Sequence, residues 1–189
     1  LLYIRGQSRD YDIWRQLGNT GWGWDDVLPY FIKAENQERG QNEFHGVGGP
    51  LSVSDQRIQL PLLNEFQNAA EEFGIPKTQD FNTGDNYGCG YFQVTEKNGF
   101  RCSTAVGYLN PIKNRKNLSI ITNAHVKKIK FENKTAKGVE YWQGSELKKV
   151  ISNKEIILSS GSIGSPQILQ TSGIGNSKKL KDLGIEIVH

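Results

Sequence analysis

Residues 161–175 read Gly-Ser-Ile-Gly-Ser-Pro-Gln-Ile-Leu-Gln-Thr-Ser-Gly-Ile-Gly, and they follow a strand-like apolar segment at residues 154–158. A strand, a turn of small residues and a helix signal, here Pro166–Leu169, let a backbone approach a phosphate or a flat cofactor closely, because glycine has no Cβ to block the approach. The N–H groups of a helix start favour anions, and proline suits the first helical turn. A purely structural turn is the alternative, and this stretch alone leaves both open.

The chain has 189 residues, enough for one or two domains. It contains no methionine and begins and ends in strand-like stretches, residues 1–4 and 185–188, so we expect a segment of a longer protein. The net charge of +3, with acids and bases interspersed, argues against nucleic-acid binding. No apolar run approaches the roughly 18 residues that a membrane span needs.

Two cysteines, Cys89 and Cys102, form neither a disulfide framework nor a metal site. The histidines are far apart in sequence, and no metal is expected. A reducing cytoplasm is the expected compartment. The protein could also associate peripherally with the inner membrane, although no segment of this chain encodes a membrane anchor.

Hydrophobic spacing predicts a mixture of helices and strands. Helices are expected at residues 10–17, 25–35, 61–73 and 103–109, and strands at 1–4, 51–53 and 91–97, with a hairpin turn at Asn98-Gly99. The helix at 61–73 is amphipathic, with one apolar face formed by Leu62, Leu63, Phe66, Ala69, Ala70 and Phe73. Five strand candidates follow as a β-meander that leads into the Gly/Ser run: 118–122, 126–132, 138–143, 148–151 and 155–158.

No residue pattern in the chain announces catalysis by itself. There is no Gly-x-Gly-x-x-Gly, and Ser165 lies in Gly-Ser-Pro rather than in a nucleophile elbow. We expect His125 to be an ordinary half-buried histidine and His45 to pack within its loop. The aromatic residues are expected to form core rather than a stacking platform: Trp14, Trp22, Trp24, Tyr30 and Phe31.

Several motifs in order accompany the Gly/Ser run. They include Tyr3-Ile4-Arg5-Gly6 with Asp10-Tyr11-Asp12, then Phe44-His45-Gly46, then Arg101-Cys102-Ser103. With the complete pattern at residues 161–175, the chain resembles the glucose-methanol-choline oxidoreductase family of flavoproteins, within it the bacterial choline dehydrogenase and alcohol dehydrogenase branch. The resemblance covers nearly the whole chain.

The resemblance implies an α/β fold class with α+β character, part of a glutathione-reductase-like FAD-binding domain with an interleaved substrate-binding domain. Residues 1–50 would extend the FAD domain and cover the flavin. Residues 51–110 would belong to the substrate-binding domain, and residues 111–189 would return to the FAD domain.

The resemblance also implies which residues contact FAD. The backbone of one valine would meet the adenine end, four small residues would form the wall of the site, and two leucines would lie near the flavin: Val126, Ser160, Gly161, Ser165, Pro166, Leu1 and Leu2. The strand at 91–95 could face the substrate. The family's general base is a histidine that would lie beyond residue 189, so no catalytic residue is assigned. The 189 residues alone are expected neither to hold FAD tightly nor to turn over.

The implied reaction is oxidation of a small primary alcohol, choline-like or aliphatic, by hydride transfer to flavin N5, with electrons passed to a quinone or another carrier. An alcohol oxidase that uses oxygen, a lyase with structural FAD and a non-enzymatic binding module are the alternatives. Oxygen consumption would distinguish an oxidase from a dehydrogenase, and anaerobic bleaching of the flavin by an alcohol would exclude a lyase.

Overall fold

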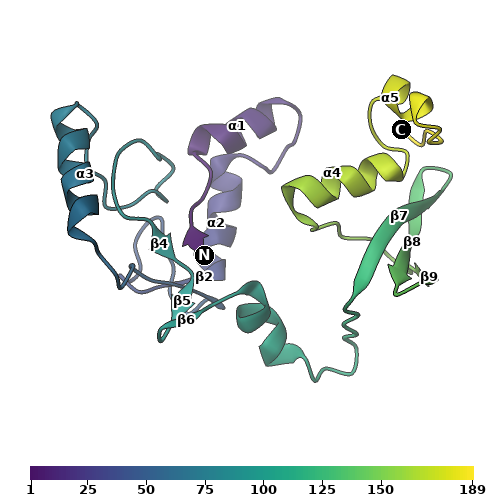
Figure 1. Ribbon diagram of the computed structural model, residues 1–189, viewed down its shortest axis with the longest axis horizontal. Coiled ribbons are helices and arrows are strands. Elements are labelled where there is room, and N and C mark those ends of the chain that lie inside the picture. The colour runs from purple at the N-terminus through teal and green to yellow at the C-terminus, as the bar shows by residue number, and fades with distance from the viewer. The chain divides into compact units, whose positions relative to one another are not determined.

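The computed structural model describes all 189 residues, and the chain divides into two compact units, residues 1–118 and 119–189 (Figure 1). The expected mixed helix and strand composition is confirmed. The three-part domain division stays a prediction.

Unit 1 contains three α-helices: α1 (Ser8–Gln16), α2 (Trp24–Ala34) and α3 (Pro61–Glu72). The first two begin where an acidic side chain reaches back to a free backbone N–H. Asp10 Oδ2 accepts from Gln7 N at 2.9 Å, and Asp26 Oδ2 accepts from Gly23 N at 3.0 Å. These contacts satisfy donors that a helix start otherwise leaves open. Three of the four helices predicted in this unit, at 10–17, 25–35 and 61–73, are confirmed within one or two residues at each end.

Short strand pairs hold unit 1 together. Strand β1 (Leu2–Tyr3) pairs antiparallel with β4 (Gln93–Val94), and β2 (Glu35–Gln37) pairs parallel with β3 (Leu51–Val53). A hairpin joins β5 (Glu96–Lys97) to β6 (Phe100–Arg101). The predicted Asn98-Gly99 turn is confirmed, with φ of 54° and 81°, values that these two residue types tolerate best.

Two predictions in unit 1 need correction. The single strand expected at 91–97 is broken into the short strands β4 and β5. The α-helix expected at 103–109 is instead a π-helical turn, η1 (Ala105–Leu109), followed by a 3₁₀ turn, η2 (Asn110–Ile112). Pro111 supplies no N–H for a regular α-helical continuation, which accounts for the change of helix type.

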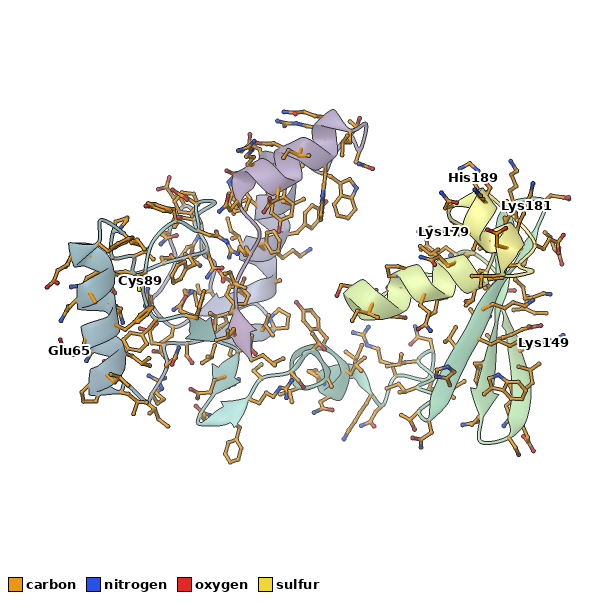
Figure 2. The ribbon with its side chains drawn as sticks, turned by 45° about the horizontal axis from the view of Figure 1, so that its top comes forward. Glu65, Cys89, Lys149, Lys179, Lys181 and His189 are labelled. Carbon is orange, nitrogen blue, oxygen red and sulfur yellow. The ribbon has the colours of Figure 1, made fainter.

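Unit 2 is a three-stranded antiparallel sheet with two helices. The sheet runs in the order β7 (Ala124–Glu132), β8 (Thr135–Gln143), β9 (Glu146–Ile151), and α4 (Gly161–Thr171) lies beside β7 (Figure 1). Helix α5 (Ser177–Asp182) follows, with Lys179 and Lys181 on it and Lys149 on β9 labelled in Figure 2. The central three strands of the predicted meander are confirmed.

Three other strand predictions are wrong for this chain: residues 118–122, 155–158 and 185–188 form no strand. An apolar segment becomes a strand only when a neighbouring strand takes up its backbone hydrogen bonds, and the segments at 118–122 and 155–158 pair with no strand. The last residues do bond to the turn after α4, with Val188 N donating to Gly173 O at 2.8 Å, but these contacts form no regular ladder. Helix α4 also begins earlier than expected. It starts at Gly161, whose φ of 81° favours glycine, so Pro166 lies inside the helix and not in its first turn.

The buried apolar core is small, and helix α3 is an example of an element that adds little to it. The predicted helix forms, but its apolar face is not buried within unit 1: the side chains of Leu62, Phe66 and Phe73 are 77%, 66% and 87% exposed. Each unit instead relies on a few buried residues, among them Val53 in unit 1 and Ile129 in unit 2. None of the helices has the length and apolar character that crossing a membrane requires.

Candidate cofactor site and a buried charge cluster

Unit 2 contains a cavity of about 380 Å³ between the start of β7 and one side of α4. Its lining combines strand backbone, a serine and a glycine near the helix start, and one aromatic side chain: Ala124, His125, Val126, Lys127, Trp142, Ser160, Gly164, Gln167, Ile168 and Thr171. This volume lies at the small end of ligand pockets, so it suits one part of a large ligand.

The wall of this cavity is held by hydrogen bonds between α4 and β7. The Thr171 hydroxyl donates to Lys127 O at 3.2 Å, and Ile129 N donates to the buried Ser172 Oγ at 2.8 Å. The register of β7 against β8 shifts between Val126 and Lys128, a bulge that changes the direction of the intervening side chain. The second half of the Gly/Ser run thus docks the helix on the sheet.

Glycine at 164 keeps the cavity open on the helix side. A Cβ built there would approach the Ser160 Cβ to 3.1 Å, tighter than most real contacts. Ser160 is fixed in turn, because its N–H donates to the Ser165 hydroxyl at 2.9 Å. The small residues of the run therefore bring the chain close to the cavity.

The residues assigned from the resemblance fall into three groups. Val126 and Ser160 line the cavity. Gly161, Ser165 and Pro166 lie on α4 beside it without lining it. In unit 1, the remaining two are on or next to β1 with exposed side chains, 65% for Leu1 and 59% for Leu2.

Sequence reasoning missed two neighbours of Val126. His125 was expected to be half-buried, but it is exposed and lines the cavity. Trp142 is its cross-strand partner, and the Lys127 ammonium lies 5.6 Å from the Trp142 ring centroid, a cation–π contact. No sequence signal joins these residues, since the pairing depends on the hairpin register.

Unit 1 contains a feature that the sequence did not predict, a cluster of four charged residues in which Arg5, Glu35 and His45 are buried and Asp80 is half-buried. His45 Nδ1 lies 2.8 Å from Glu35 Oε1, and His45 Nε2 lies 2.7 Å from Asp80 Oδ2. The Arg5 guanidinium lies 2.9 Å from the same Glu35 oxygen, which also accepts from Gly46 N at 2.9 Å. His45 does pack within its loop as expected, but as part of an ion cluster.

These contacts shift the pKa values of the cluster in consistent directions. Burial lowers the pKa of His45, but hydrogen bonds from its ring to Asp80 and Glu35 outweigh burial and raise it to about 9. Burial opposes ionisation of both carboxyl groups, yet the pKa of each is lowered, mainly by the hydrogen bond to His45. Burial raises the pKa of the neighbouring Tyr3 to about 12.

The aromatic cluster of unit 1 is only partly core, which corrects the prediction. Trp24 is buried, but Trp14, Trp22 and Tyr30 are 46%, 54% and 71% exposed. Trp22 and Tyr30 border a shallow apolar cavity of about 590 Å³ on α1 and α2. The rings pack edge to face, as in the pair Tyr11–Trp14 with centroids 5.4 Å apart. These ring contacts bury one side of the cluster and leave the other side exposed.

Comparison with known proteins identifies the family. A family model described as GMC oxidoreductase matches residues 1–187. The chain belongs to the GMC oxidoreductase family. It is 40% identical to human mitochondrial choline dehydrogenase, 44% to the oxygen-dependent choline dehydrogenase of Chromohalobacter salexigens and 40% to the alcohol dehydrogenase [acceptor] of Pseudomonas putida. Each alignment covers 100% of this chain but 32%, 34% and 35% of the relative, so the chain spans about a third of these relatives.

Solved structures agree with this assignment. An FAD-dependent oxidoreductase from Chaetomium thermophilum superposes with a TM-score of 0.85 at 33% identity, over 98% of this chain and 35% of that one. Pyridoxine 4-oxidase from Mesorbium loti superposes with a TM-score of 0.86 at 30% identity, over 99% of this chain and 37% of that one. The expected fold class is confirmed, and FAD is confirmed as the cofactor at the level of the family.

The cavity of unit 2 fits part of this cofactor. Its volume accommodates a nucleoside portion but not a whole dinucleotide, its wall lacks a Cβ at Gly164, and its aromatic lining residue offers a ring face. The donor set contains backbone, hydroxyl and amide groups, which recognise purine edges and ribose hydroxyls through hydrogen bonds.

Proposed function

We propose that the whole protein oxidises a primary alcohol, choline-like or aliphatic, to the aldehyde. When bound, FAD would supply the hydride acceptor at flavin N5, and a base would take the hydroxyl proton. Family membership and relatives that are choline and alcohol dehydrogenases support the reaction class. The electrons would pass to a quinone or another carrier. Two free cysteines suit a protein of the reducing cytoplasm, which is the compartment we propose.

The cavity beside Val126 carries the proposal for this chain's own role. The backbone at Val126 would hold the adenine end, and Ser160 would border it, with Gly161, Ser165 and Pro166 supporting that wall from α4. In unit 1, Leu1 and Leu2 are the proposed flavin neighbours, which suits their exposed side chains. These residues bind and orient the cofactor. None of them moves a proton.

A substitution that fills the cavity tests this assignment. Gly164→Leu would place a side chain in the space between α4 and β7, and we expect the dissociation constant of FAD in the whole protein to rise at least about tenfold, or about 1.4 kcal/mol. Ser162→Leu is the matched control, because Ser162 is exposed on the same helix and lines no part of the cavity. Flavin fluorescence titration measures both. Equal affinity in the two variants would remove the cavity from the cofactor site.

Oxygen is a second candidate acceptor. Two similar proteins are named an oxygen-dependent choline dehydrogenase and a pyridoxine 4-oxidase, and these names support oxygen as the alternative electron acceptor. Oxygen uptake with an alcohol substrate, set against dye reduction under nitrogen, separates the two acceptors. Anaerobic bleaching of the flavin by the alcohol supports oxidation over lyase chemistry, and absence of bleaching would contradict the proposal.

A further inference from the structure

We propose that Arg5, Glu35, His45 and Asp80 form a positioning cluster for the segment at Leu1–Leu2, and that His45 acts in it as an obligatory cation. The inference rests on the proposed function, because it is FAD that this segment would face. All four residues belong to unit 1 and lie on separate parts of its chain.

The geometry around the imidazole favours protons on both ring nitrogens, because the contacts to the two carboxylates are shorter than the 3.3 Å contact between Gln37 Nε2 and Nδ1. A carboxylate only accepts hydrogen bonds, and neutral imidazole has a single N–H. With Glu35 at 2.8 Å from Nδ1 and Asp80 at 2.7 Å from Nε2, a neutral ring would press one lone pair against a carboxylate oxygen. The protonated ring donates to both. His45 is 2% exposed, so water cannot replace either contact.

The charges of the cluster balance only in that state. Arg5 and protonated His45 face Glu35 and Asp80, two positive charges against two negative. The other groups near the ring do not alter this balance: the Gln37 amide is neutral, Tyr3 stays protonated, and Arg39 is paired with Asp55 at 2.7 Å. Loss of the histidine proton therefore leaves an unbalanced buried negative charge, which is costly.

Arg5 transmits the state of the cluster to the segment before it. Its guanidinium donates to the backbone carbonyls of Phe44 at 2.7 Å and Asn82 at 3.1 Å. Phe44 adjoins His45, and Asn82 N donates to Asp80 Oδ1 at 2.8 Å. The two loops that hold the ring therefore also hold Arg5.

The segment is continuous with Arg5 through strand β1. Tyr3 pairs with Gln93 and Leu2 pairs with Val94, and Thr95 N donates to Leu1 O at 2.8 Å. On the other side, Arg5 Nε donates to the Tyr3 hydroxyl at 3.2 Å. The position of this short strand therefore depends on residues 93–95 and on the anchored arginine that follows it. His45 acts on the flavin side through Arg5 and is a positioning residue.

The test uses the intact FAD-loaded protein and the dissociation constant of FAD, measured by flavin fluorescence from pH 6.5 to 9.5. The variants are His45→Gln and the control His189→Gln, whose side chain is exposed in the C-terminal segment (Figure 2). We expect wild type and the control to bind FAD evenly up to about pH 8 and to weaken as the pH rises through 9. His45→Gln should bind about tenfold more weakly at pH 7 and show no such change with pH.

A second variant keeps the test decisive if His45→Gln fails to fold. Asp80→Asn removes one counter-charge of the imidazolium, so the weakening of FAD binding should move to lower pH. Circular dichroism at each pH separates loss of positioning from unfolding, because a merely structural role would change the affinity only in step with the fold. Wild-type pH dependence retained in both variants would overturn the inference. Failure of the wild type itself to bind FAD would instead overturn the proposed function, and this inference with it.

Discussion

Replacement of Ser172 by alanine tests how α4 is fixed to the sheet of unit 2. The Ser172 hydroxyl is buried and accepts from Ile129 N at 2.8 Å, while donating to Ile168 O. In Ser172→Ala the Ile168 carbonyl still accepts from the backbone N–H of residue 172, at 3.1 Å in the wild type, but the buried Ile129 N–H has no partner. An unsatisfied buried donor costs about 1–3 kcal/mol.

Hydrogen–deuterium exchange at the Ile129 amide measures this cost locally. A loss of about 1–3 kcal/mol corresponds to exchange that is about 5- to 150-fold faster. Ser162→Ala is the control on the exposed side of the same helix and should leave that amide unchanged. Thr171→Val should have a smaller effect, because the Thr171 hydroxyl is exposed and its bond to Lys127 O is 3.2 Å long. Equal exchange at Ile129 in Ser172→Ala and wild type would refute the reasoning.

Three further outcomes are expected. The pKa of His45 in the folded protein, about 9, lies above the ordinary 6.5, so the stability that protonated His45 contributes is complete below pH 6.5 and is lost as the pH rises through 9. Urea unfolding should therefore show the free energy of unfolding falling by up to about 3 kcal/mol by pH 10, and His45→Gln should show no such fall. Gly173→Ala should destabilise unit 2 far more than Gly184→Ala by the same assay: both have positive φ, but only at Gly173 would a Cβ meet a backbone oxygen, at 2.3 Å. Thiol labelling should modify half-buried Cys89 before buried Cys102, and the reverse order would contradict the packing of unit 1.

Local features were predictable from the sequence because neighbouring residues determine them. The acidic helix starts at Asp10 and Asp26, the Asn98-Gly99 turn and the alternation along β7 to β9 all depend on short spacings. The strands expected at 118–122 and 155–158 failed because a strand also needs a partner, and spacing says nothing about which segments lie side by side.

The sequence predicted part of the cofactor site but not the charge cluster of unit 1. Val126 and Ser160 could be named from motifs, and they do lie at one cavity. The charge cluster could not be found, because Arg5 and Asp80 are separated by most of unit 1 and no pattern links them. Only the folded chain brings them within reach of His45.

The long-range pairing in unit 1 has a consequence for how the chain folds. Strand β1 at Leu2–Tyr3 pairs with Gln93–Val94. The Arg5 N–H donates to Asn82 Oδ1, which lies 77 positions later in the chain. Contacts this distant form slowly, since a long loop must close before they gain anything. Unit 2, built from adjacent hairpins, needs no such delay. During synthesis strand β1 would thus remain without its partner β4 until about 90 further residues have emerged, whereas each hairpin of unit 2 could pair soon after its second strand is made.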